Sequence, residues 1–375
     1  MTRVLIVGGG ISGLATALLL SRQGVEVDLV ERQERVEALG SGITLIGAAL
    51  RVLDTLGVYE ECLAHGFGVT DFETYNADGT LDSSFPLPSP FGSDGPGMLG
   101  MLGMMRPALH RILLDRAAVE GTTVRTATSP VRIEQDADSV TVEFNTGETG
   151  VYDLVVGADG FRSTVRQLVF GRMTPEFQGQ GILRVVLPRP AEVTAEIQFH
   201  TVGDVFIGFT PTASDRMYMY ITFPVEEGYR PDRAELVELA RKHIQPFGGV
   251  AALIRDDIRD PEQINYTSFE TMVVPVPWYR GRVVITGDAA HCPTPHLAAG
   301  AAMCLEDAVA LAEELATAPA LEKALTAYND RRYPRCKFVV ETGNQLSYWQ
   351  THPDTPGADH GGVIAAAFEK LAGPF

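Results

Sequence analysis

The sequence predicts an α/β fold: a Rossmann-like domain with a parallel sheet, an inserted domain with an antiparallel sheet, and C-terminal helices. Three patterns favour it. Residues 4–7 form a continuous apolar run that leads directly into closely spaced glycines, as in a nucleotide-binding βαβ unit. Residues 177–223 alternate apolar and polar side chains between turn signals, which is typical of an antiparallel sheet. Residues 283–285 return to the apolar run of a buried parallel strand.

The individual elements follow from the spacing of apolar residues and from the turn residues between them. Strands are predicted over 4–7 and 25–30, and further short strands lead up to residue 156. Proline and glycine are frequent over 86–103, which predicts a loop or lid. A polar turn over 351–362 precedes a short terminal helix. The other helices are predicted over 11–19 (closed by Gly24), 47–56, 106–120, 232–244 (capped by Asp232), 301–315 and 321–340.

The composition restricts the partners and the compartment. The 375-residue chain carries a formal net charge of −18, which disfavours nucleic acid and anionic membrane surfaces, because both are polyanions. No apolar stretch approaches the roughly 18 residues of a membrane span. We therefore expect a cytoplasmic protein without stable membrane association. Its four cysteines show no C-x-x-C pair and no metal-ligand spacing, so free thiols and no metal centre are expected; they are Cys62, Cys292, Cys304 and Cys336.

The first glycine motif predicts a dinucleotide site. Its glycines supply a tight turn, a close approach of the ligand and close packing of helix on strand, so that a pyrophosphate can lie on the helix N-terminus. Glu31 ends the second strand, 18 residues after the last of these glycines, where a carboxylate can bind adenosine ribose hydroxyls. The residues predicted to bind the cofactor here are Gly8, Gly10, Ile11, Ser12, Gly13, Glu31 and Arg32.

Two later segments have the same form, an apolar strand followed by a turn of small residues. Residues 153–160 end in a Gly-Ala-Asp-Gly turn that contains Asp159. An ordinary turn in which this carboxylate bonds to nearby backbone remains the alternative. Residues 283–291 contain Gly287 and Asp288, and here the carboxylate follows a buried strand and can accept a cofactor hydroxyl. His291 at the end of this segment favours a structural hydrogen bond over a catalytic base.

In this order and at this spacing, the three motifs resemble those of the single-component FAD-dependent aromatic hydroxylases, the group A flavoprotein monooxygenases that include p-hydroxybenzoate and salicylate hydroxylases. The resemblance extends from about residue 2 to residue 335. It implies non-covalent FAD as cofactor, NAD(P)H as transient co-substrate and O2 as oxidant. The implied reaction is hydroxylation of a small aromatic or heteroaromatic, phenolic substrate through a flavin C4a-hydroperoxide. The assembly is expected to be a monomer or homodimer.

The resemblance also assigns roles to residues around the flavin. Asp288 would bind the ribitol, and Asp159 would back the flavin and contact NAD(P)H. Arg106 matches the arginine that opens the family's Arg-x-x-Leu helix and reaches the flavin. The helix that starts near Gly300 and Ala301 would direct its N-terminus at the isoalloxazine ring. The family's Gly-Gln-Gly turn at this point reads Ala-Ala-Gly here, so only its last glycine remains. Arg162 and Arg166 are either solvated charges or ligands of a nicotinamide phosphate.

The predicted substrate-side residues come from the antiparallel sheet and from the turn after the third motif. Arg184 matches a position that approaches the substrate in relatives, and His200 and Tyr218 lie on polar strand faces. Pro295 lines the hydroxylation site in relatives, and His296 beside it could meet a phenolate. The alternative for the sheet residues is a polar face that meets solvent.

The resulting domain organisation is discontinuous. The FAD-binding domain is predicted to comprise 1–67, 104–171 and 276–345, the substrate-binding domain 68–103 and 172–275, and a tail helix 346–375. Two other functions stay open at this stage: an FAD-dependent reductase or oxidase without oxygen insertion, and a non-catalytic flavin-binding protein. Substrate-triggered NAD(P)H consumption with a hydroxylated product separates the monooxygenase from both.

Overall fold

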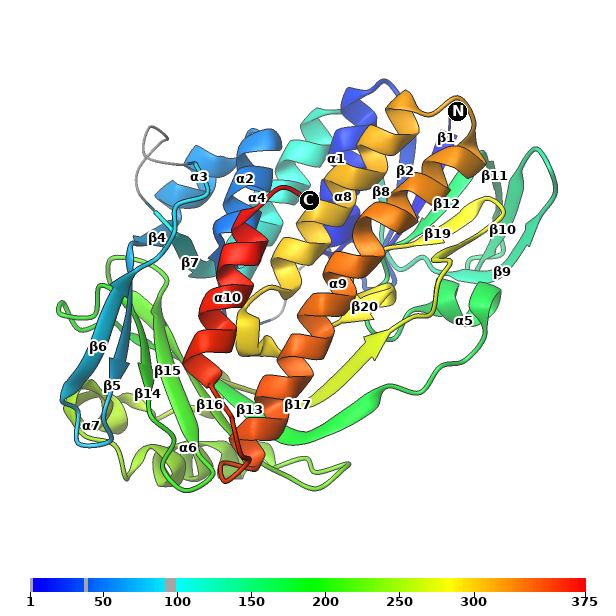
Figure 1. The fold of residues 1–375 in the computed structure, drawn as a ribbon. Helices are drawn as coiled ribbons and strands as arrows, with labels where there is room; N and C mark the ends of the chain where they lie inside the picture. The colour runs from blue at the N-terminus through cyan, green and yellow to red at the C-terminus, as the bar shows by residue number, and fades with distance from the viewer. Residues whose placement is uncertain (1–2, 37–39, 92–98) are drawn as a thin grey trace.

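A computed structural model describes residues 3–36, 40–91 and 99–375 (Figure 1). One layer is a six-stranded sheet in the order β18-β19-β12-β1-β2-β8, in which all neighbours are parallel except β18 and β19. The mixed α/β fold class is thus confirmed. The strands are β1 (Arg3–Val7), β2 (Glu26–Val30), β8 (Thr123–Arg125), β12 (Leu154–Gly157), β18 (Tyr279–Arg280) and β19 (Val283–Ile285).

Helices cover this sheet, and they come from both ends of the chain (Figure 1). α1 (Ile11–Arg22) packs against both α4 and α8, and its residues 11–18 are all buried, as the apolar spacing predicts. The other helices here are α2 (Gly47–Thr55), α3 (Tyr59–Ala64), α4 (Arg106–Val119), α5 (Thr164–Phe170), α8 (Gly300–Thr317), α9 (Leu321–Thr351) and α10 (His360–Ala372). No helix in the described part of the chain has the length and apolar character needed to cross a membrane.

A second large sheet has eight strands in the order β20-β17-β13-β16-β15-β14-β5-β6, antiparallel except for the β14–β5 pair. One face carries a core of aliphatic and aromatic side chains that includes residues of α6 (Leu236–Ile244) and α7 (Gly249–Ile254). The strands are β5 (Asp71–Tyr75), β6 (Leu81–Pro86), β13 (Glu176–Pro188), β14 (Glu196–Phe199), β15 (Phe206–Pro211), β16 (Arg216–Pro224), β17 (Ile264–Val273) and β20 (His291–Cys292).

Two three-stranded sheets complete the fold. One has the order β11-β10-β9, and the other, β3-β7-β4, lies between the helices and the large antiparallel sheet. Their strands are β3 (Gly42–Ile46), β4 (Gly66–Val69), β7 (Met101–Met105), β9 (Pro130–Gln135), β10 (Val140–Phe144) and β11 (Thr149–Tyr152).

Three local predictions differ from the structure. The segment 86–103 is not all loop, because β7 occupies its end; residues 92–98 lie outside the described residues. Asp232 makes no capping hydrogen bond, since the chain first forms a 3-10 turn (η1, Arg233–Glu235) and α6 begins only at Leu236. α9 continues to Thr351, and its 31 residues span about 46 Å, from the parallel sheet to strands β13 and β17 (Figure 1).

Candidate cofactor and active site

The glycine turn after β1 is shaped by backbone contacts on two sides. Gly8 has φ +111°, and a Cβ there would lie 2.4 Å from the carbonyl oxygen of Ala158. A Cβ on Gly13 would lie 2.0 Å from the carbonyl oxygen of Gly8. Gly10 differs, because it is exposed and a Cβ there would meet no atom within 4 Å. No contact within the protein therefore requires a glycine at this position. A pyrophosphate bound at the N-terminus of α1 would require one, because a side chain here would obstruct its approach.

Glu31 and His110 hold the same turn in place. The Glu31 carboxylate accepts the backbone N–H groups of Gly9 and Gln33, both at 2.9 Å. Buried His110 on α4 bonds through Nε2 to the carbonyl oxygen of Gly9 at 2.6 Å. Burial lowers the pKa of His110, so the neutral ring donates here. Glu31 follows β2, as predicted, while its contact with an adenosine ribose stays a prediction; His110 is a positioning residue that the motif did not reveal. Arg32, beside Glu31, is exposed.

The first and third motifs meet at Gly287, in the 3-10 turn η4 (Gly287–Ala289). Its φ is +60°, and a Cβ there would lie within 3.1 Å of both Ser12 on α1 and Cys304 on α8. The Ser12 hydroxyl lies 3.3 Å from the hydroxyl of Thr286. Among the described residues, the half-buried carboxylate of Asp288 accepts one hydrogen bond, from the Cys304 thiol at 3.7 Å. Its remaining acceptor capacity is open to a cofactor hydroxyl.

The aspartate of the second motif, Asp159, has a different role from the predicted contact with FAD and NAD(P)H. Asp159 accepts the Ser163 hydroxyl at 2.5 Å and the backbone N–H groups of Thr164 and Val165 at 2.6 and 3.0 Å. Both of its oxygens are therefore occupied by the N-terminus of α5, which is the turn-forming alternative. Burial raises the pKa of Asp159 despite these bonds. Arg166 is likewise buried rather than solvated, and it donates to the carbonyl oxygens of Ala289 and Phe161.

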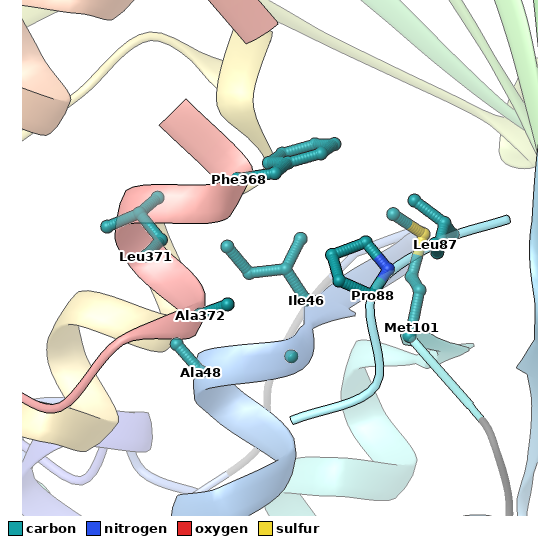
Figure 2. A pocket seen from close by; sticks show the side chains of 10 residues that line it. Ile46, Ala48, Leu87, Pro88, Met101, Phe368, Leu371 and Ala372 are labelled. Carbon is teal, nitrogen blue, oxygen red and sulfur yellow. The ribbon is translucent and has the colours of Figure 1, made fainter. Parts of the chain in front are cut away.

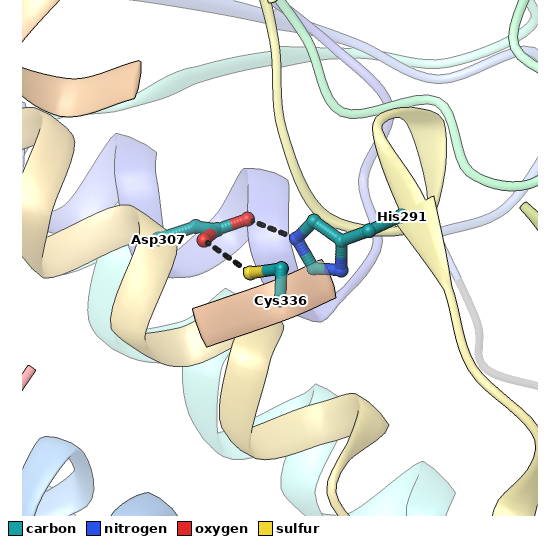
Figure 3. Close-up of side chains that lie close together, drawn as sticks. All are labelled: His291, Asp307 and Cys336. Atoms are coloured by element: carbon teal, nitrogen blue, oxygen red, sulfur yellow. Dashed lines mark hydrogen bonds and ion pairs between the residues drawn. The ribbon is translucent and has the colours of Figure 1, made fainter. Parts of the chain in front are cut away.

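A buried ionic cluster lies behind the third motif (Figure 3). Asp307 on α8 accepts the backbone N–H of Gly287 at 2.9 Å and lies 2.6 Å from Nε2 of His291. Its other oxygen accepts Nε of Arg332 on α9 at 2.7 Å. Burial alone would raise the pKa of Asp307, but His291 and Arg332 outweigh it and lower this pKa far below its ordinary value. His291 thus has the structural role predicted for it.

The same cluster brings together three groups with metal-ligand chemistry: His291, Asp307 and the thiol of Cys336. The sequence spacing did not suggest this grouping. The Arg332 guanidinium lies in contact with two of them, 2.7 Å from Asp307 and 3.6 Å from the Cys336 sulfur. A metal ion at this position would be repelled by the Arg332 guanidinium. The arrangement is that of an internal ion pair that ties α8 and α9 to the glycine turn.

The turn before α8 carries backbone strain. Ala298 has φ +49°, the left-handed region that favours glycine. It stands at the first position of the family's Gly-Gln-Gly sequence. Gly300 and Ala301 form the first turn of α8, where no side chain caps the helix, so its N–H groups remain available to an anionic ligand edge.

Arg106, Arg184 and Tyr218 lie near one another, on α4 and on strands β13 and β16, and their predicted contacts with flavin and substrate stay predictions. Arg106 begins α4; it is exposed, and its guanidinium has no partner in the part of the chain that the structure describes. Arg184 on β13 is half-buried and donates to the Thr267 hydroxyl at 3.1 Å. Burial lowers the pKa of Arg184, and Arg106 lowers it further while Tyr218 opposes this. Tyr218 is buried, and its hydroxyl bonds to Thr44 of β3 at 2.6 Å.

His200 does not join this group. β14 ends at Phe199, so the alternation that would direct His200 to the polar face stops one residue earlier. The His200 ring is exposed and pairs with Asp82 of β6 at 3.0 Å. Its prediction as a substrate-side residue is wrong in placement, because the strand pattern does not reveal where the strand ends.

Pro295 and His296 lie in the 3-10 turn η5 (Pro295–Leu297), which packs against α9 and α10. Both ring nitrogens of His296 are engaged, Nδ1 with Thr294 and Nε2 with the amide oxygen of Gln350, each at 2.9 Å. Burial lowers the pKa of His296 to about 4, so the ring is neutral at pH 7. It donates from Nε2, which leaves no free nitrogen to act as a base.

A small apolar cavity lies under α10 (Figure 2). Phe368 and Leu371 of α10 line it together with Ile46, Leu87 and Pro88, and its volume is about 20 Å³. That is room for one or two water molecules and not for an aromatic ring. As formed by the described residues, this cavity is therefore too small to hold a substrate ring.

Comparison with known proteins decides the family. An FAD binding domain family matches residues 1–342. The FAD-dependent monooxygenase YetM of Bacillus subtilis, described as putative, is 33% identical over 348 residues, 92% of this chain and 93% of its own. The chain belongs to the FAD-dependent aromatic hydroxylases. It is an FAD-dependent monooxygenase, and FAD is its cofactor.

Other relatives in this family act on aromatic compounds. The 2-heptyl-3-hydroxy-4(1H)-quinolone synthase of Pseudomonas aeruginosa is 33% identical and covers 93% of this chain and 90% of its own. The 3-hydroxybenzoate 6-hydroxylase of Klebsiella oxytoca is 30% identical over 92% and 87%. Among solved structures, Klebsiella pneumoniae HpxO with FAD and uric acid has a TM-score of 0.85 at 22% identity, covering 99% of this chain and 92% of that one, which shows the shared fold.

The residues present fit FAD. The exposed Gly10, the open acceptor capacity of Asp288 and the uncapped N-terminus of α8 all lie at the edge where the three motifs converge. Gly10 leaves room for the pyrophosphate, Asp288 can accept a ribitol hydroxyl, and the N–H groups of α8 can donate to the flavin ring.

Proposed function

We propose that this protein uses NAD(P)H and O2 to hydroxylate a small aromatic or heteroaromatic substrate that carries a ring hydroxyl. The family membership supports the reaction class. Two arginines support the substrate class. Half-buried Arg184 and exposed Arg106 lie on surfaces that face each other across the two domains.

Bound FAD would supply the redox chemistry, namely hydride acceptance from NAD(P)H and activation of O2. The chain's own residues bind and orient the reactants. The glycine turn, Glu31 and Asp288 would hold the cofactor non-covalently. The free N–H groups of α8 would stabilise negative charge on the flavin ring by roughly 0.3–2 kcal/mol.

Arg184 would favour the ionised form of a ring hydroxyl, because a cation within a few ångströms lowers the pKa of a phenol. An electron-rich phenolate is the form in which an aromatic ring accepts oxygen most readily. Pro295, in the turn before α8, would form the wall beside the reacting carbon, and neutral His296 would hold that turn through Thr294 and Gln350.

The test is a screen of the purified, FAD-loaded protein against hydroxybenzoates, hydroxypyridines and hydroxyquinolones with NADH or NADPH. We expect at least one compound to accelerate NAD(P)H oxidation and to yield a product heavier by one oxygen atom. Arg184→Gln should weaken that stimulation while FAD content stays normal, and His200→Ala should leave both unchanged.

Two outcomes would point elsewhere. NAD(P)H oxidation without an oxygenated product from any compound would favour the reductase or oxidase alternative. Bound FAD that neither NADH nor NADPH reduces would favour a non-catalytic flavoprotein.

A further inference from the structure

A buried glutamine near the end of α9, which no sequence motif marks, joins three parts of the molecule. Gln350 is 6% exposed. Its Oε1 accepts Nε2 of Gln180 on β13 at 3.0 Å and Nε2 of His296 in η5 at 2.9 Å. Its own Nε2 donates to the hydroxyl of Thr222 on β16 at 2.8 Å. One amide therefore connects α9, the antiparallel sheet and the turn that contains Pro295.

The groups around this amide hold it in one orientation. The Ser347 hydroxyl donates to Oε1 of Gln180 at 2.5 Å, so Nε2 of Gln180 is directed at Gln350. Ser347 and Gln180 are fully buried. Because a buried polar group without a partner is unfavourable, each member of the network stabilises the pairing of the others.

Gln350 also determines which nitrogen of His296 carries the proton. An amide oxygen only accepts hydrogen bonds, so Oε1 of Gln350 requires a proton on Nε2 of His296. Nδ1 then accepts the hydroxyl of Thr294, which belongs to the same turn and is buried. The imidazole is thereby held in a single tautomer between α9 and the backbone that leads into Pro295.

The turn is attached to the sheet face that carries Arg184. Thr222, which accepts the Gln350 amide, lies on the same face as Arg184 by the register of β13 and β16. Phe269 on β17 lies on that face too, by the register of β13 and β17. The His296 ring packs edge-on against Phe269, with 5.5 Å between the ring centroids.

We propose that Gln350 is a positioning residue of the monooxygenase reaction, which sets the Pro295 turn at a fixed distance from Arg184 through His296. This rests on the proposed function, in which Pro295 forms the wall beside the reacting carbon and Arg184 approaches the substrate. Gln350 acts through His296 rather than by contact with a reactant. Such placement affects the reaction strongly, because a displacement of about 1 Å can cost roughly a hundredfold in rate.

The experiment compares Gln350→Met with wild type in the FAD-loaded protein. Methionine is similar in size but lacks the amide, so His296 loses its acceptor and Thr222 its donor. In protein labelled with nitrogen-15 at histidine, NMR should show one tautomer of His296 in wild type, protonated at Nε2, and a mixture of tautomers in Gln350→Met. The signal is assigned by its loss in His296→Gln.

The second measurement uses the aromatic compound that the screen identifies. In Gln350→Met, the fraction of oxidised NAD(P)H recovered as hydroxylated product should fall by about tenfold, because the reacting atoms are less well placed. FAD content and the KM for NAD(P)H should stay as in wild type. Gln350→Glu keeps an acceptor for His296, so it should retain the Nε2 proton and a product fraction closer to that of wild type.

The matched control is Asn329→Leu. Asn329 is also a buried amide of α9, and its oxygen accepts the backbone N–H of Trp278 at 3.1 Å, about 30 Å along the helix from Gln350. The control should lose stability without a change in the His296 tautomer or in the product fraction. Should Gln350→Met not fold, Thr222→Val removes the anchor of the amide on the sheet and should lower the product fraction in the same way.

The proposal is overturned if Gln350→Met keeps the wild-type tautomer or the wild-type product fraction, or if Asn329→Leu lowers that fraction equally. Failure of the proposed function has a different signature. In that case no compound is oxygenated, whereas the tautomer of His296, which is measured without substrate, still responds to Gln350→Met.

Discussion

The guanidinium of Arg166 donates to the carbonyl oxygen of Ala289 at 2.8 Å, which joins the second motif to the third across 123 positions of the sequence. The same side chain donates to the carbonyl oxygen of Phe161 at 2.6 Å, so it also closes its own turn. A single buried cation thus fixes how the turn after β12 and the turn after β19 lie relative to each other.

Replacing Arg166 by Met should therefore destabilise the fold and weaken FAD binding together. Each lost hydrogen bond from a charged donor contributes about 1.5–3 kcal/mol. Urea unfolding and an FAD titration measure the two effects. Arg162→Ala is the matched control, because Arg162 is exposed, and it should change neither quantity. A stable Arg166→Met variant with full FAD affinity would contradict the structural role.

Replacing Asp307 by Asn should cost about 3–5 kcal/mol of unfolding free energy, because His291 loses its buried counter-charge and Arg332 keeps only its pair with Glu306. Glu313→Gln removes an exposed pair with Arg331 instead, and its cost should stay below about 1 kcal/mol.

The same aspartate predicts an acid-sensitive fold. The pKa of Asp307 is lower in the folded state than in the unfolded state, so its contribution is fully present above about pH 4 and is lost as the pH falls below that value. Unfolding curves from pH 7 to pH 3 should show a steeper loss of stability for wild type than for Asp307→Asn. Parallel curves for the two proteins would refute this.

Replacing Asp288 by Ala should weaken FAD binding by about 1.5–3 kcal/mol without destabilising the apoprotein. The only hydrogen bond that its carboxylate accepts from the described residues comes from the Cys304 thiol, so the fold depends little on it. Asp288→Asn keeps an acceptor oxygen and should lose less affinity. Equal FAD affinity in all three proteins, measured by quenching of flavin fluorescence, would show that the carboxylate does not contact the cofactor.

Replacing Ala298 by Gly should stabilise the protein by about 1 kcal/mol, because the left-handed φ of +49° strains alanine but not glycine. Ala299 next to it has φ −97°, so Ala299→Gly gains nothing and should destabilise by about 0.5–1 kcal/mol. Thermal unfolding of the two variants compares them directly. A lower melting temperature for Ala298→Gly would be evidence against strain in this turn.

The cofactor side of the site was largely predictable from sequence, because its parts are local. Gly8, Gly13 and Gly287 lie in turns whose geometry needs glycine, and such turns leave a readable pattern. The residues that support these turns were not predictable in the same way. His110 reaches Gly9 across 101 positions, and Arg332 reaches Asp307 from a different helix.

The substrate side was harder to predict, because alternation in a strand shows which residues share a face but not where the strand ends or what covers it. Glu196 and His200 have the same parity, yet one is buried in a hydroxyl network and the other pairs with Asp82 at the surface. Asp159 shows the same limit. An aspartate in the turn after a strand is expected both where it caps the next helix, as it caps α5 here, and where it binds a cofactor, so the sequence does not distinguish the two roles.

The order of the parallel sheet has a consequence for biosynthesis. β1 lies between β2 and β12, and β12 pairs with β19, so the central strands come from residues 3–7, 154–157 and 283–285. Strand β19 cannot join until more than 280 residues have been translated. Until then the edge of β12 has no partner on that side, and the apolar residues Val155 and Val156 are exposed to solvent or to other chains. Yield of the folded protein should therefore depend on events late in synthesis, when β19 and α8 close that edge.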